Sequence, residues 1–193
     1  MTESIEITQQ HFQYIAKIAG NNIMIIRKAE LKDLEELLNI YNYEVANGTA
    51  TFDIVPKNLA EWQVWFQNHN STHHPLYVAE IDNHIGGYVT LSSYREKEAY
   101  NSTVELSLYV SPDYRQRGVA SRLMEFAIQL AKEDEQIHTI ISVITSNNQI
   151  SILLHQKYGF QYCGTIHEVG FKMGNYLDVD NYQLIIQKRN TIQ

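Results

Sequence analysis

The sequence is short of several residue types, and each shortage excludes a class of protein. Cys163 is the single cysteine among 193 residues, which excludes an internal disulfide and a zinc site built from cysteines. Lys and Arg number 15 against 22 Asp and Glu, so the net charge is −7 and the chain lacks the basic surface of a general nucleic-acid binder. No apolar run approaches the about 18 residues of a membrane span, and no basic flank leads into an apolar stretch near the N-terminus. These absences predict a cytoplasmic protein that contacts neither nucleic acid nor membrane.

What is present is typical of one soluble globular domain. Hydrophobic residues make up 44% of the chain and charged residues 19%, and a domain usually takes ~100–200 residues. Near the start, Phe12, Ile15, Ala16 and Ala19 fall on one helical face, and a Gly-Asn-Asn turn ends the pattern at 20–22. The sequence therefore predicts a helical N-terminal extension over 1–23, a domain over 24–187 and a tail over 188–193.

Within the domain, hydrophobic periodicity predicts a mixed α/β fold. Helical spacing and strand-like alternation follow each other with hairpins between them, rather than in the strict alternation of a doubly wound sheet. The predicted helices cover 31–43, 58–66, 119–132 and 148–157, and the predicted strands cover 24–27, 76–81, 85–92, 103–110, 139–145, 161–169 and 182–187.

The segment 109–121 is the most informative, because a strand, a short turn and a helix start follow each other there. Small residues at Gly118 and Ala120 let the backbone approach a ligand, and the first-turn amides of a helix favour an anion. The segment predicts a pyrophosphate cradle, and the alternative is an ordinary helix start with a basic first turn. Three arginines add positive charge there: Arg115, Arg117 and Arg122.

These residues carry a family resemblance. The turn Arg115-Gln116-Arg117-Gly118-Val119-Ala120 resembles the acetyl-CoA-binding motif (Gln/Arg-x-x-Gly-x-Gly/Ala) of the GNAT acetyltransferase superfamily, and 147–160, ending in Tyr158-Gly159-Phe160, resembles its second coenzyme motif. The resemblance runs from about Met24 to Ile186 and implies a mostly antiparallel twisted sheet, splayed at the acetyl-CoA site and flanked by helices. Further motifs resemble the phosphinothricin acetyltransferase group: Ile40-Tyr41-Asn42, Thr49-Ala50-Thr51-Phe52, Thr103-Val104-Glu105, Leu154-His155, Val169-Gly170-Phe171-Lys172-Met173-Gly174 and Leu177-Asp178-Val179.

The resemblance implies acetyl transfer from acetyl-CoA, as cosubstrate, to a primary amine without a metal. The pyrophosphate would rest on the helix-start amides, and the splayed strand end would bind the pantetheine amides. The amide of Val110 would polarise the thioester oxygen. The coenzyme-binding residues implied in this way are Leu108, Tyr109, Val110, Arg115, Gln116, Arg117, Gly118, Val119, Ala120, Ser121 and Asn147.

Two residues are candidates for proton transfer. Glu105 lies on the strand face opposite Val104 and Leu106, and burial would raise its ordinary pKa of ~4.3 towards that of a useful base; the alternative is a solvent-facing strand residue. His155 stands four residues before the motif glycine, where many superfamily members carry a tyrosine as general acid, and an imidazole with a pKa of ~6.5 can donate or accept a proton near neutrality. The alternative is a helix histidine satisfied by a neighbouring backbone group, and Tyr158 is interpreted mainly as a packing residue.

The substrate pocket is implied by the same resemblance. Arg95 can pair with a carboxylate or phosphinate in bidentate geometry, and the alternative is an exposed loop arginine. Tyr94 stands where a tryptophan is common in the group, and Asn175-Tyr176 where Arg-Trp is common, which leaves the particular substrate open. The candidate substrate-binding residues are Tyr94, Arg95, Phe52, Tyr100 and Lys172.

The leading function is therefore an N-acetyltransferase for a small amino acid or analogue of the phosphinothricin or methionine sulfoximine/sulfone type, acting by direct attack in a ternary complex. Cys163 lies outside the coenzyme motifs, which argues against an acetyl-enzyme. The alternatives are acetylation of a protein N-terminus or a polyamine, and a non-catalytic acetyl-CoA sensor. The resemblance also predicts a homodimer. A metal site at His69, His73 and His74 is disfavoured, because the spacing lacks the HExxH glutamate.

Overall fold

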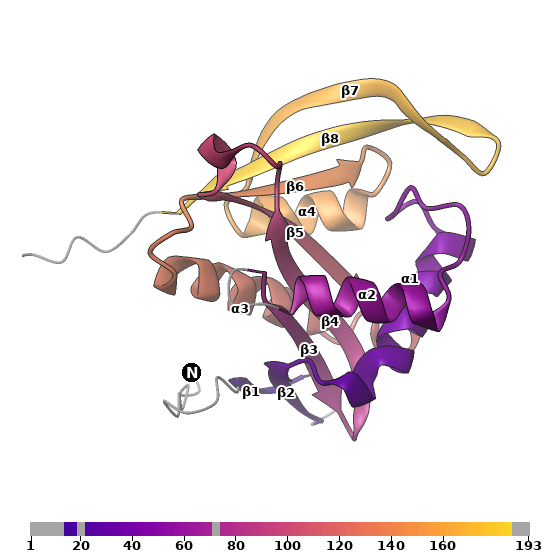
Figure 1. The fold of residues 1–193 in the computed structure, drawn as a ribbon, viewed down its shortest axis with the longest axis vertical. Helices are drawn as coiled ribbons and strands as arrows, with labels where there is room; N and C mark the ends of the chain where they lie inside the picture. Colours follow the sequence, from indigo (N-terminus) through magenta and orange to yellow (C-terminus); the bar gives the residue numbers. More distant parts are fainter. Residues whose placement is uncertain (1–13, 19–21, 71–73, 187–193) are drawn as a thin grey trace, which may run out of the picture.

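A computed structural model describes residues 14–18, 22–70 and 74–186. The strands form one eight-stranded sheet in the order β1-β2-β3-β4-β5-β6-β8-β7 (Figure 1). The strands are β1 (Tyr14–Lys17), β2 (Ile23–Lys28), β3 (Leu76–Ile81), β4 (His84–Ser93), β5 (Thr103–Val110), β6 (Thr139–Thr145), β7 (Gln161–Lys172) and β8 (Asn175–Ile185). The helices are α1 (Leu34–Asn47), α2 (Leu59–His69), α3 (Val119–Glu133) and α4 (Gln149–Lys157), with 3-10 turns η1 (Leu31–Asp33), η2 (Glu98–Tyr100) and η3 (Pro112–Tyr114).

The sheet divides where β5 meets β6. These strands run parallel and pair over three residues, the last pair being Glu105 with Ile141, whereas the other described strand pairs are antiparallel. Both strands continue beyond that pair without bonding to each other, which leaves a gap between 106–110 of β5 and 142–145 of β6, here called the fork. The predicted sheet, mostly antiparallel and splayed at one point, is confirmed.

Helices cover both faces of the sheet (Figure 1). On one face, α1 and α2 enclose a core that includes Leu37, Trp62 and Tyr88. On the other face, the larger core includes Leu123 of α3 and Ile152 of α4. Because side chains alternate along a strand, β5 presents its residues to two different layers.

The N-terminal segment differs from the prediction. Residues 14–17 form β1, an edge strand antiparallel to β2, instead of part of a helix. Ile15 is exposed and Ala16 is buried, so the segment alternates as a strand does. Pairing with the free edge of β2 supplies backbone hydrogen bonds that outweigh a weak helical preference. The rest of the predicted helix, including Phe12 and Ala19, lies outside the described residues, as does 187–193.

The C-terminal hairpin is longer than predicted. β7 and β8 together span 161–185 and extend beyond the body of the sheet (Figure 1). Irregular pairing between Tyr162 and Gly164, and between Ile166 and Gly170, breaks the strict alternation on which the sequence prediction relied. No described helix is long and apolar enough to span a membrane.

Candidate active site

A cleft of about 830 Å³ occupies the fork and extends to the start of α3. Its lining comes from both arms of the fork, the turn before α3 and the first turn of that helix, the inner side of α4, the loop after α1 and one residue of β8. The lining residues on which the argument depends are Glu105, Ser142, His155, Phe52, Gly118 and Ser121. The segments that the two coenzyme motifs occupy therefore meet at one cavity.

The turn before α3 is shaped to receive an anion. Gln116 has φ +60° and Gly118 has φ +89°, both in the left-handed region, and Gly118 occupies the N-cap position without a side-chain cap bond. The first-turn amides of α3 are consequently left without a capping side chain at the edge of the cleft, where the helix dipole also favours negative charge. This geometry fits the pyrophosphate of the predicted coenzyme.

The three arginines around this turn do not all line the cleft. Arg115 lines the cleft, but its guanidinium pairs with the carboxylate of Glu44, and its Nε lies 3.4 Å from the oxygen of Val110. Arg117 and Arg122 line a smaller neighbouring hollow of about 390 Å³ instead of the main cleft. The attraction of the cradle for an anion thus comes mainly from backbone amides, with Arg117 close by.

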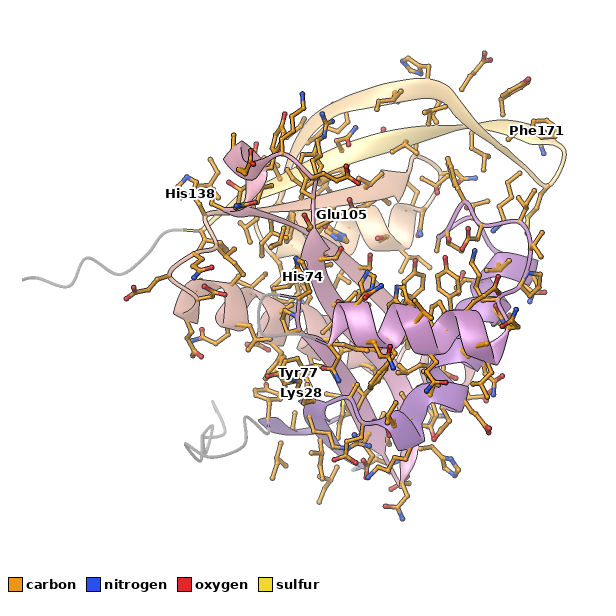
Figure 2. All side chains as sticks on the ribbon, viewed as in Figure 1. Lys28, His74, Tyr77, Glu105, His138 and Phe171 are labelled. Atoms are coloured by element: carbon orange, nitrogen blue, oxygen red, sulfur yellow. The ribbon has the colours of Figure 1, made fainter. Side chains whose placement is uncertain are left out.

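Glu105 lies in the cleft at the base of the fork, where Figure 2 labels it on β5. Burial raises the pKa of its carboxyl above the ordinary value. A half-buried carboxylate inside the cleft does not fit the alternative of a solvent-facing strand residue. Its raised pKa suits a base that takes a proton from an amine.

His155 faces the cleft from α4 and is 5% exposed. Its Nδ1 lies 2.7 Å from the carbonyl oxygen of Ser151, and since a carbonyl only accepts, Nδ1 carries the hydrogen. Burial lowers the pKa of the imidazole. Nε2 of the neutral ring therefore has a free lone pair, and it is buried without a hydrogen-bond partner among the described residues. Because Nε2 of neutral His155 carries no hydrogen, this atom must accept a proton before it can donate one to a ligand.

Asn147, predicted to reach the coenzyme, is not among the residues that line the cleft, whereas its neighbour Asn148 is. Asn148 lines the cleft and caps α4, accepting a hydrogen bond from the amide of Ser151 at 3.2 Å. Asn147 is instead 3.4 Å from the hydroxyl of Thr49. The spacing of Asn148 to Ser151 is that of an N-cap, a signal that could have pointed to Asn148 as the first residue of the α4 turn that faces the cleft. Tyr158 donates to the oxygen of Ser121 at 2.9 Å, which joins α4 to α3.

The predicted substrate residues are divided between three places. Phe52 lines the cleft. The Arg95 guanidinium lies 4.9 Å from the ring centre of Tyr94 and 5.5 Å from that of Tyr100, and this exposed cluster lies outside the cleft lining. Lys172 is not among the residues that line the cleft, although it contacts the lining residue Thr51.

Lys172 is 4% exposed and bonds to the backbone. Its Nζ donates to the oxygen of Thr51 at 2.8 Å and to that of Glu44 at 3.3 Å. The ammonium thus fastens the loop after α1 to β7. Sequence reasoning could not find this contact, because about 120 residues separate the partners.

Several lining residues were not predicted, and Ser142 is the most informative of them. Ser142 is a single small polar residue in the otherwise apolar run 140–144, and that interruption is a signal that the sequence did contain. Within 14–18, 22–70 and 74–186, no group of three His, Cys, Asp or Glu residues could hold a metal ion. His73 lies outside the described residues.

Comparison with known proteins now decides the family. The model of the acetyltransferase (GNAT) family matches residues 32–160. The chain belongs to the GNAT family. The L-methionine sulfoximine/L-methionine sulfone acetyltransferase of Pseudomonas aeruginosa is 36% identical over 160 residues, which are 82% of this chain and 92% of that protein. The phosphinothricin N-acetyltransferase of Streptomyces coelicolor is 36% identical over 162 residues, 82% of this chain and 94% of the relative.

This chain is also similar to a solved structure that contains acetyl-CoA. The GNAT phosphinothricin acetyltransferase of Sinorhizobium meliloti, in complex with acetyl-CoA, has a TM-score of 0.81 and 28% identity, covering 91% of this chain and 92% of that one. This GNAT protein is accordingly an acetyl-CoA-dependent N-acetyltransferase, as the sequence predicts. The family match begins at residue 32 and leaves β1 and β2 outside it.

Proposed function

We propose that this GNAT enzyme acetylates the primary amine of a small amino acid or amino-acid analogue, by direct attack on acetyl-CoA in a ternary complex. The named relatives act on phosphinothricin and on methionine sulfoximine and sulfone, which share an α-amine and a compact polar side chain. The observation that carries the proposal is the half-buried Glu105 at the base of the fork, in one cleft with an uncapped helix start. A base and a pyrophosphate cradle in one cavity are what direct transfer requires.

Glu105 acts first in the proposed reaction. An amine attacks a thioester only in its neutral form, and the carboxylate of Glu105 takes its proton directly or through a water. The N–C bond then forms as the carbonyl oxygen gains negative charge. The amide of Val110, at the end of β5, is proposed to stabilise that charge.

His155 is proposed to act on the sulfur side as a neutral acceptor. Because Nδ1 already donates to Ser151, only Nε2 can exchange a proton with a ligand. Any proton that His155 gives to the departing sulfur must first be acquired during the reaction. This refines the role of a simple general acid that the resemblance implies.

The amine substrate is proposed to contact Phe52 inside the cleft and the cluster of Tyr94, Arg95 and Tyr100 at its outer side. The guanidinium of Arg95 is exposed and has no described carboxylate partner, so it is available to pair with a substrate carboxylate or phosphinate. Lys172 is left out of the proposed pocket, because backbone carbonyls hold its ammonium.

The test measures acetyl-CoA-dependent thiol release with one amine at a time. The panel holds phosphinothricin, methionine sulfoximine, methionine sulfone, common amino acids, spermidine and a short peptide. A control without amine subtracts any signal from Cys163, which is exposed. Saturable turnover on an amino-acid analogue supports the proposal. Turnover on spermidine or the peptide alone contradicts it.

We also propose a homodimer in the cytoplasm. The hairpin of β7 and β8 exposes the apolar side chains of Ile166, Val169 and Phe171, each at least half exposed, and a second copy of the chain would cover them. Sedimentation at the monomer mass over a wide concentration range would contradict the dimer. Cell fractionation tests the location.

A further inference from the structure

We propose that Ser142 is a further catalytic residue, whose hydroxyl donates a hydrogen bond to the coenzyme sulfur as the thioester C–S bond breaks. The inference rests on the proposed transfer reaction. It assigns a role to a residue that neither the sequence motifs nor the family resemblance includes.

Ser142 stands at the base of the fork. It is the first residue of β6 beyond the last parallel pair, Glu105 with Ile141, and it lines the cleft. The side chain is 1% exposed, yet Oγ has no hydrogen-bond partner among the described residues. A buried hydroxyl without a partner destabilises the folded protein, so its presence in the cleft points to an acceptor that a ligand brings.

His155 places a second unpartnered atom in the same cleft. Tyr182 connects the two residues: it pairs with Ser142 across β6 and β8, and its ring centre is 6.4 Å from that of His155. No hydrogen bond joins Ser142 to His155 in the described structure, so neither satisfies the other. One hydroxyl donor and one imidazole acceptor therefore remain for a ligand.

Ser142 and Glu105 belong to opposite faces of the sheet. The side chain of Ser142 lies on the same face of the sheet as those of Ile140 and Ile144, which are in the core beneath α3 and α4. The side chain of Glu105 lies on the same face as that of Tyr109, whose ring packs against Tyr41 of α1. An amine that approaches beside Glu105 and a sulfur that departs beside Ser142 would thus use the two sides of the gap through the sheet.

The chemistry balances without a further reactant. The amine nitrogen, whose ammonium proton Glu105 has already taken, bonds to the carbonyl carbon and releases its second proton through water to solvent, while the C–S electron pair moves onto sulfur. The products are the acetamide, a proton and the coenzyme thiolate, and Ser142 keeps its own proton throughout. A hydrogen bond to an ionised acceptor is stronger than one to a neutral acceptor, so the Ser142 contact strengthens as charge develops on sulfur.

The experiment compares Ser142→Ala with Thr90→Val. Thr90 is 3% exposed, and its hydroxyl also lacks a described partner, but it lies on β4 outside the cleft lining. Ser142→Ala is expected to lower kcat about tenfold and to change the KM for acetyl-CoA by less than about twofold, the loss of one charge-assisted hydrogen bond. Thr90→Val is expected to retain the wild-type kcat.

A second readout needs no amine. The thiol pKa of bound coenzyme A is followed by the ultraviolet absorbance of the thiolate, in a Cys163→Ser background and with the spectrum of the free enzyme subtracted. The wild type should hold this pKa about one unit below that of free coenzyme A, and Ser142→Ala should return it most of the way. Thermal unfolding of the unliganded Ser142→Ala variant should be unchanged or higher, because the substitution removes an unpaired buried hydroxyl.

The results separate this inference from the function on which it rests. An unshifted thiol pKa in wild-type enzyme overturns the role of Ser142, even if Ser142→Ala does not fold. An equal loss of kcat in Thr90→Val also overturns it, since the effect would then be structural. Failure of the proposed function would appear elsewhere, as absence of wild-type turnover on the amino-acid analogues.

Discussion

The two halves of the cleft are built in different ways. The coenzyme half comes from 108–121, one continuous strand, turn and helix start, together with α4. The proposed amine half uses the loop 49–52, which lines the cleft, the 94–100 connection outside the lining and β7, which holds the loop, and these segments lie far apart in the sequence. A site made from one segment is visible in local patterns, whereas a site assembled from several depends on tertiary contacts.

Those tertiary contacts are specific in the amine half. The loop 49–52 is held by Lys172 of β7 at Thr51, by the hydroxyl of Thr145 at the Thr49 carbonyl, and by Tyr41, whose hydroxyl is 2.9 Å from that of Thr51. The loop is therefore bonded to both β6 and β7. A substitution on β7 should therefore change the KM for the amine without changing that for acetyl-CoA.

The largest expected effect is that of Glu105→Gln, which tests where the two halves meet. Loss of the base should lower kcat about 10²–10⁴-fold, while the Kd for acetyl-CoA stays nearly unchanged. Steady-state kinetics and calorimetric titration of the coenzyme measure the two quantities. Full activity of the variant would remove Glu105 from the mechanism.

Although Glu105→Gln should lower kcat, it should not lower the stability of the folded protein. Burial raises the pKa of Glu105 in the folded protein, so the folded state binds more protons than the unfolded state between the two pKa values. The contribution of Glu105 to the free energy of unfolding thus falls as pH rises through that window. Glu105→Gln removes this loss, and its Tm at neutral pH should equal or exceed that of the wild type. A lower Tm would contradict the sign.

The coenzyme half was largely predictable, because its signals are local. The left-handed Gly118 and the alternation that turns Glu105 away from the α3 layer follow from neighbouring residues. The role of Lys172 as a fastener and the strand at Tyr14–Lys17 depend on partners elsewhere in the chain, which no local pattern reveals. Asn148 lines the cleft and Asn147 does not, a one-residue difference of the kind expected at element boundaries, the least certain part of any sequence pattern.

Lys172→Met should produce the next largest effect. The variant leaves the carbonyls of Thr51 and Glu44 without a charged donor in a buried position, at a cost of about 2 kcal/mol in the free energy of unfolding. Denaturant unfolding measures the loss, and the KM for the amine should rise while that for acetyl-CoA does not. Lys32→Met is the matched control, because Lys32 is exposed and its described ion pair is with an exposed carboxylate, Glu30. Equal losses in the two variants would contradict the anchoring role.

Arg95→Ala tests the outer side of the amine half. If the guanidinium pairs with a substrate carboxylate, its removal should raise the KM for the amino-acid analogue about tenfold and leave kcat and the KM for acetyl-CoA unchanged. Lys97→Ala, an exposed cation two residues away, is the control. An unchanged KM would remove Arg95 from the pocket. A lower KM for spermidine in the variant would favour a cationic substrate.

The smallest expected effect is that of Gly170→Ala, which acts on the amine half through a single ring. A Cβ at Gly170 would clash with Cε2 of Phe52, so the ring, which is 38% exposed, must turn away. Because Phe52 lines the cleft, we expect the KM for the amine to rise about threefold, with little change in stability since an exposed ring can move. Val169→Ala, at an exposed neighbour on β7, should leave both KM values unchanged. A parallel rise in the KM for acetyl-CoA would mean that the two halves are not independent, and that Phe52 contacts both substrates.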